Sequence, residues 1–197
     1  MSQDPSRSSA GRTPFWLRVA RTARLHADTY EEVEADPSSI LQATGIVLVS
    51  GLAGVLGAFL RIQLGTPLPG SALPLPWHLA LIGLEPLVVW IVGCAFAYMV
   101  GATFLKGPET ETDYRELLRT TGFAFAPGSL AFFAWLPPAA LGLGIIALAK
   151  LWVLLACIVG IRQALDFTTG RAIGTLGVSF VLLWLMLWGL TITPLPL

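Results

Sequence analysis

Five long apolar stretches alternate with polar segments along the chain. Each comes close to the ~20 residues that a helix needs to cross the core of a bilayer, and backbone groups inside lipid must be paired within a helix. The pattern therefore predicts an all-α membrane bundle with residues 1–38 as a cytoplasmic leader and residues 39–197 as the membrane domain. The five predicted transmembrane helices cover residues 40–60, 79–105, 121–136, 139–161 and 172–193.

Pro86 leaves two possibilities open for the second span. If the helix begins at Leu79, Pro86 bends it and Glu85 lies inside the membrane. If the helix begins at Glu85, Pro86 occupies the first turn, where proline is tolerated, and residues 77–84 lie along the membrane surface. The sequence favours neither possibility.

The basic residues predict the orientation of the bundle. Loops on the cytoplasmic side of a membrane protein carry an excess of Lys and Arg. If all five predicted spans cross the membrane, ten of the twelve basic residues fall in three regions on the same side of it. Arg61 is the one basic residue in the segments on the other side, and Lys150 lies within a span. We therefore expect a cytoplasmic N-terminus and a C-terminus on the far side. The ten residues are Arg7, Arg12, Arg18, Arg21 and Arg24 in the leader, Lys106, Arg115 and Arg119 after the second span, and Arg162 and Arg171 after the fourth.

Composition narrows the classes of function. Hydrophobic residues make up 55% of the chain and charged residues 12%, about half the charged content of a soluble domain. This excludes a soluble enzyme, and the lack of a basic face excludes a nucleic-acid binder. Cys94 and Cys157 both lie in apolar stretches, which excludes a disulfide scaffold, and His26 and His78 fall on opposite sides of the membrane, so they cannot share a metal. With no catalytic motif in the sequence, we expect neither enzymatic activity nor a cofactor.

The leader contains a predicted amphipathic helix over residues 15–25. Phe15 and Trp16 fall on its apolar arc at about 100° per residue. One interpretation is a helix that lies on anionic lipid, and the other is a helix packed on the protein's own cytoplasmic face. For the lipid interpretation, the interface residues are Phe15, Trp16, Arg18, Arg21 and Arg24.

An acidic segment follows this helix. Thr29 and Glu32 have the spacing of a capping box, and residues 36–39 are typical of the turn that opens the first span. The acidic side chains could bind a cation or a basic partner, although a simple solvated helix is the interpretation that we favour. The candidate partner contacts are Tyr30, Glu31, Glu32, Glu34 and Asp36.

Two charged residues are predicted at membrane depth. Lys150 lies eleven residues from each end of the span 139–161, and a charge in that position is costly and usually faces other helices or a water-filled cavity. Glu85 is the one acidic residue that could pair with it. Otherwise, Lys150 would bind backbone carbonyls released near Pro86 or Pro127, or reach the interface by tilting of its helix.

Small residues recur every four positions in the first two spans. They are Ser50 and Gly54, Ala53 and Gly57, and then Gly93, Ala97 and Gly101. Such stripes allow helices to approach closely. We expect them to serve packing within the chain rather than contact between copies.

Three segments of the sequence resemble the bacterial branch of the Yip1 family. They are Tyr-Glu-Glu-Val-Glu-Ala-Asp at 30–36, the segment 117–127 ending in Gly-Phe-Ala-Phe-Ala-Pro, and the segment 162–172 with its Gln-Ala-Leu-Asp turn. The resemblance implies a five-helix membrane protein with a cytoplasmic N-terminus and supplies no catalytic residues. The Asp-Leu-Tyr-Gly-Pro-type motif of the eukaryotic members is not present, so their link to Rab GTPases does not extend to this chain. Ten Arg against two Lys fits a GC-rich bacterial genome.

The first hypothesis for function is a non-enzymatic scaffold of the bacterial inner membrane that contacts lipids and other membrane proteins. The second is an accessory subunit of a larger respiratory or photosynthetic membrane complex. The third is a small transporter or channel that uses Glu85 and Lys150.

Overall fold

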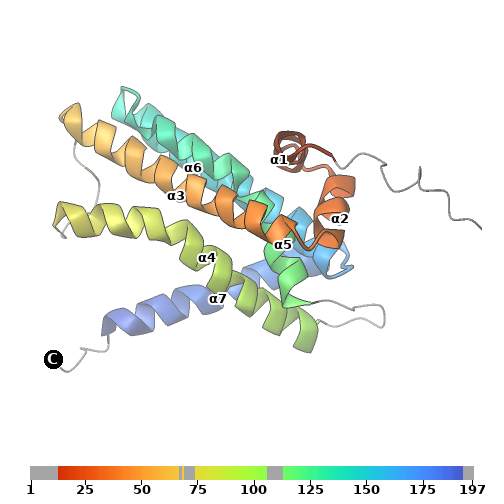
Figure 1. The fold of residues 1–197 in the computed structure, drawn as a ribbon. Helices are drawn as coiled ribbons and strands as arrows, with labels where there is room; N and C mark the ends of the chain where they lie inside the picture. The colour runs from red at the N-terminus through yellow and green to blue at the C-terminus, as the bar shows by residue number, and fades with distance from the viewer. Residues whose placement is uncertain (1–12, 67, 69–73, 106–112, 193–197) are drawn as a thin grey trace, which may run out of the picture.

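A computed structural model describes residues 13–66, 68, 74–105 and 113–192, and every regular element in this part of the chain is a helix (Figure 1). Four helices are long and apolar enough to cross a membrane, and they correspond to four of the five predicted spans. They are α3 (Ser39–Gln63), α4 (Leu75–Thr103), α6 (Ala139–Ala164) and α7 (Thr169–Ile192).

The remaining predicted span, residues 121–136, is not a single α-helix. Its first residues end α5 (Tyr114–Ala124), and the rest form the 3₁₀-helix η2 (Ala126–Trp135). Pro127 explains the change, because it has no N–H to donate to the carbonyl four residues earlier and its ring clashes there. A run of ten 3₁₀ residues is long for this kind of helix.

The second span is one continuous helix with Pro86 inside it. Residues 77–84 therefore belong to α4, and the possibility that they form a separate surface segment is wrong. Figure 1 shows that α4 bends along its length, as expected where a proline interrupts the hydrogen-bond ladder. Glu85 thus lies within the helix, next to the bend.

Close packing of small residues holds the long helices together. η2 lies between α3 and α6, while α4 packs on α3 and α7. A Cβ atom at Gly57 of α3 would collide with the carbonyl oxygen of Ala131 in η2, and one at Gly51 would collide with that of Gly83 in α4. The predicted role of the small-residue stripes in internal packing is therefore confirmed for Gly57 of α3. A Cβ atom at Gly93, in the stripe of α4, would meet nothing within 4 Å.

Two short helices, α1 (Phe15–Ala23) and α2 (Ala27–Ala35), cover one end of the bundle. α3 begins at this end, and the turn between α6 and α7 lies there too (Figure 1). α1 is seen nearly end-on while α3 runs across the view, so α1 lies across the bundle rather than along it. The predicted capping box at Thr29 is wrong, because Thr29 lies inside α2; the capping box in the structure joins Asp113 and Glu116 at the start of α5.

Candidate functional site

A buried arginine joins the first three helices. Arg18 of α1 is only 2% exposed. Its Nη1 donates to Asp36 Oδ2 at 2.9 Å and to Ser39 Oγ at 3.2 Å, while its Nη2 donates to Glu32 Oε1 at 2.8 Å. Since Glu32 lies in α2 and Ser39 is the first residue of α3, one guanidinium fixes both short helices to the start of the first long one.

The charges of this network stabilise one another. Burial alone would lower the pKa of Arg18, but its hydrogen bonds to Asp36 and Glu32 outweigh burial and raise the pKa. Burial alone would likewise raise the pKa of Glu32, yet hydrogen bonds from Thr13 and Arg18 hold it below its usual value. Arg18 and Glu32 are therefore both charged at neutral pH, and each charge stabilises the other.

This geometry corrects the expected position of Arg18. We expected its guanidinium at the lipid interface, but the acidic residues of α2 and the turn after it draw it into the protein. Arg21 and Arg24 remain exposed, as do Phe15 at 47% and Trp16 at 69%. α1 thus packs on the protein's own face through Arg18 and Thr22, and the Phe15 ring lies edge-on against buried Phe123 with the ring centroids 6.3 Å apart. Trp16, Arg21, Arg24 and the exposed half of Phe15 remain available to contact lipid.

Two aromatic side chains complete the attachment of α1. The Tyr30 hydroxyl, from α2, donates to the carbonyl of Thr22 at 3.1 Å. The indole Nε1 of Trp152, from α6, donates to the carbonyl of Ala23 at 2.7 Å. Both acceptors lie in the last turn of α1, where carbonyls lack partners within the helix.

The expected partner contacts divide into two groups. Tyr30 is fully buried and Asp36 is 6% exposed, and Glu32 is bound to Arg18. These three side chains make contacts within the protein, and their expected contact with a partner stays a prediction. Glu31 and Glu34 face elsewhere, toward a recess.

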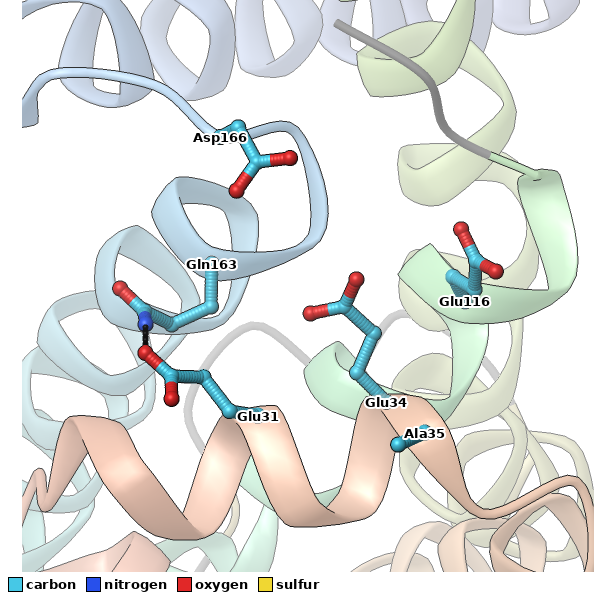
Figure 2. A pocket seen from close by; sticks show the side chains of 6 residues that line it. All are labelled: Glu31, Glu34, Ala35, Glu116, Gln163 and Asp166. Atoms are coloured by element: carbon cyan, nitrogen blue, oxygen red, sulfur yellow. Dashed lines mark hydrogen bonds between the residues drawn. The ribbon is translucent and has the colours of Figure 1, made fainter. Parts of the chain in front are cut away.

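The recess is a cavity of about 260 Å³ at the same end of the bundle (Figure 2). Figure 2 shows Glu34 of α2 pointing into the space between Glu116 of α5 and Asp166 after α6. Gln163 Nε2 donates to Glu31 Oε1 at 2.7 Å and joins α6 to α2. The residues that line the cavity are Glu31, Glu34, Ala35, Glu116, Gln163 and Asp166.

The position of Glu34 in the recess raises its pKa. Burial is the main cause, and the negative charges of Glu116 and Asp166 add to it; together they raise the pKa of Glu34 to about 7, against a smaller opposing effect of Arg119. Arg119 is occupied by the main chain, since its Nε and Nη2 donate to the Glu34 carbonyl at 3.0 and 2.6 Å. Within the described ranges, no group of three or more His, Cys, Asp or Glu side chains is arranged to hold a metal ion.

Two of the three segments that carry the resemblance line this recess. Residues 30–36 contribute Glu31, Glu34 and Ala35, and residues 162–172 contribute Gln163 and Asp166. The third, residues 117–127, lies beside it through Arg119, which donates to the Glu34 carbonyl. A family model described as the Yip1 domain matches residues 25–191. The chain belongs to the Yip1 family. No curated protein and no solved structure matches the chain.

The Yip1 match covers every helix of the bundle and begins directly after α1. The segments that carried the resemblance all lie within it, and α1 is an addition at its N-terminal side. Membership of the family and the four long apolar helices together make this a multi-pass membrane protein.

The two charged residues that the sequence predicts at membrane depth form an ion pair. Lys150 Nζ of α6 lies 2.5 Å from both carboxylate oxygens of Glu85 in α4. The two side chains are 56% and 44% exposed, respectively. Of the arrangements that the sequence left open for Lys150, pairing with Glu85 is the one adopted.

Proposed function

We propose that this Yip1-family protein is a non-enzymatic scaffold of the bacterial inner membrane, with five crossings and a cytoplasmic N-terminus. In this proposal, it holds helix α1 against the cytoplasmic leaflet and presents a face for other membrane proteins beside it. The observation that carries the proposal is the attachment of α1, which is fixed to the bundle by Arg18, Tyr30 and Trp152.

The length of η2 supports a fifth crossing. A 3₁₀-helix rises ~2.0 Å per residue, so ten residues reach ~20 Å. Residues 121–124 of α5 add ~6 Å at the α-helical rise, and the sum approaches the ~30 Å of a bilayer core. η2 also packs between α3 and α6, and irregular backbone is tolerated at membrane depth where protein surrounds it.

The exposed face of α1 supports contact with lipid. Phe15 and Trp16 are the kind of side chains that enter the boundary between headgroups and acyl chains. Arg21 and Arg24 are exposed on the same helix, and each basic residue near an anionic leaflet contributes about 1 kcal/mol of attraction. Because α1 is fixed to the bundle, these side chains meet the membrane without the cost of ordering a free helix.

The acidic recess supports a contact with another protein. The carboxyl groups of Glu31 and Glu116 lie on this part of the surface, and Glu34, whose pKa is about 7, adds negative charge as it ionises. Such a surface suits a basic segment of a neighbouring membrane protein. Of the five candidate partner contacts in residues 30–36, the proposal assigns this contact to Glu31 and Glu34.

The depth of α1 in a bilayer tests the proposal. Cys94 and Cys157 are replaced with Ala, and single cysteines at Trp16 or Asp28 carry a nitroxide label in the full chain. The chain is reconstituted into vesicles of phosphatidylethanolamine and phosphatidylglycerol, and collisions with oxygen and with a water-soluble nickel complex give the depth of each label. We expect the label at position 16 at the headgroup boundary and the label at position 28, on an exposed site of α2, in water.

Omission of phosphatidylglycerol provides the second arm of the experiment. Since Arg21 and Arg24 would then lose their electrostatic attraction, the label at position 16 should move toward water. A label at position 16 that is as accessible to nickel as the one at position 28, in both lipid mixtures, would contradict the proposed contact with the leaflet.

A further inference from the structure

Arg61 is a buried cation at the end of the bundle opposite α1. It lies in the last turn of α3 and is 5% exposed. Its Nε has no hydrogen-bond partner among the described residues, and none of the ion pairs in this part of the chain includes it. A buried donor or charge is costly unless it is paired, so the Nε–H of Arg61 lacks the acceptor that its position requires.

Trp135 provides a second donor without a partner. It is the last residue of η2, and its Nε1 is buried without a hydrogen bond within the described ranges. The side chain as a whole is only partly buried. Its ring therefore extends from the interior, where the N–H lies, to the surface.

The register of two parallel helices brings these donors to one level. Ser50 of α3 faces Gly128 of η2, and further along Gly57 faces Phe132, so the two helices run in the same direction. Four α-helical residues from Gly57 to Arg61 rise ~6 Å, and three 3₁₀ residues from Phe132 to Trp135 also rise ~6 Å. Positions i and i+4 share a face of an α-helix, and positions i and i+3 share a face of a 3₁₀-helix. Arg61 and Trp135 therefore continue the same interface by one turn.

The start of α6 adds positive potential at this point. A Cβ atom at Gly142, in the first turn of α6, would collide with the carbonyl oxygen of Ala134. The N-terminus of this 26-residue helix thus lies against the end of η2, and the free N–H groups of a helix N-terminus favour an anion. Pro137 and Pro138, which join the two helices, have no N–H groups of their own.

We propose that Arg61 and Trp135 form a phosphate-binding site at this end of the bundle and that its ligand is the headgroup phosphate of a phospholipid. Arginine is well suited to phosphate because its planar fork donates to two oxygens at once. In a multi-pass protein whose α3 spans the bilayer, the last turn of that helix lies at the level of lipid phosphates. The site is separate from the lipid contact proposed for α1, since it lies at the opposite end and does not depend on which end is cytoplasmic.

Native mass spectrometry of the full chain in detergent, titrated with single lipids, tests the site. The probes are phosphatidylglycerol, diacylglycerol with the same acyl chains, and inorganic phosphate as a competitor. We expect one phosphatidylglycerol to bind at least 10-fold more tightly than diacylglycerol. We expect Arg61→Met to weaken that binding at least 10-fold and Trp135→Phe, which removes only the N–H donor, to weaken it severalfold. Arg115→Met, which removes an exposed charge of α5 that belongs to neither proposed lipid contact, is the matched control and should leave this binding unchanged.

Each remaining outcome decides against the site. Equal affinity for the two lipids, or wild-type affinity in both Arg61→Met and Trp135→Phe, would show that these residues do not bind a phosphate. Displacement of the lipid by millimolar inorganic phosphate would show that the ligand is the free anion rather than a phospholipid. If Arg61→Met does not fold, Trp135→Phe decides the question, because it preserves charge and nearly all of the volume.

Discussion

Replacement of Arg18 with Met should release α1 and α2 from the bundle. The change removes a guanidinium that makes four hydrogen bonds to Glu32, Asp36 and Ser39. It leaves the Asp36 carboxylate, which is 6% exposed, with the contacts to Ser38 but without its cation. Loss of one partner from a buried ion pair costs about 3–5 kcal/mol. We expect the lower end, about 3 kcal/mol, because Glu32 is partly exposed and keeps its bond from Thr13.

The rate of cysteine labelling measures this loss. Thr22 is fully buried in α1, so a cysteine at that position, in the chain without Cys94 and Cys157, reacts with a maleimide only when the cap opens. A cost of about 3 kcal/mol corresponds to a roughly 100-fold greater population of the open state, and labelling should accelerate by the same factor. Arg21→Met removes an exposed positive charge from the same helix and serves as the control. Equal labelling rates in the Arg18→Met and Arg21→Met chains would refute the argument.

Three further predictions concern other parts of the fold. The pKa of Glu34 is about 7 in the folded protein, against an ordinary value of 4.5, so the folded state binds more protons between these pH values and its stability should fall as pH rises from about 4.5 to 7 and level off above. Glu34→Gln should remove this loss, which is about 1 kcal/mol after allowance for solvent screening. A thermal midpoint that depends on pH equally in the wild-type and Glu34→Gln chains would contradict the prediction. Gly57→Ala should destabilise the bundle by about 1–3 kcal/mol through overpacking. Gly45→Ala is the control and should not lower the thermal midpoint, because a Cβ atom there meets nothing within 4 Å. Similar midpoints for the two variants would argue against the close contact between Gly57 and η2. Lys150→Met should lower the thermal midpoint more than the double variant Lys150→Met/Glu85→Gln does, because only the single variant leaves an unpaired carboxylate in the membrane. Additive effects of the two substitutions on the midpoint would show that the two side chains do not interact.

The long helices were predictable because hydrophobic length is a local property of the sequence. Four spans appear within a few residues of their expected ends, since each contains enough apolar residues to form a helix without help from a distant segment. The span 121–136 differs because sixteen residues are too few for an α-helical crossing. That shortness, together with Pro127, is the signal in the sequence for the more extended 3₁₀ conformation. Amino-acid composition and hydrophobic periodicity do not by themselves distinguish a 3₁₀-helix from an α-helix.

The contacts of the charged end depended on residues that are far apart in the sequence. A helical wheel places Arg18 on the polar arc of α1 and cannot show that acceptors 14 to 21 residues later enclose it. The recess was missed for the same reason, because Glu116 comes from one distant segment and Gln163 and Asp166 from another. The pairing of Lys150 with Glu85 could be anticipated, since the predicted spans contain very few other charged residues that could pair with Lys150.

The sidedness of the segment that contains η2 tests the proposed five-crossing scaffold most directly. Asp113 and Ala140 flank this segment, and both are exposed. Single cysteines at the two positions, in the chain without Cys94 and Cys157, are treated with a membrane-impermeant maleimide in sealed inverted vesicles, whose outer surface is the cytoplasmic face. The account predicts that position 113 is labelled at once and position 140 only after detergent is added. Labelling of both positions before detergent would place them on one side and contradict the crossing by η2.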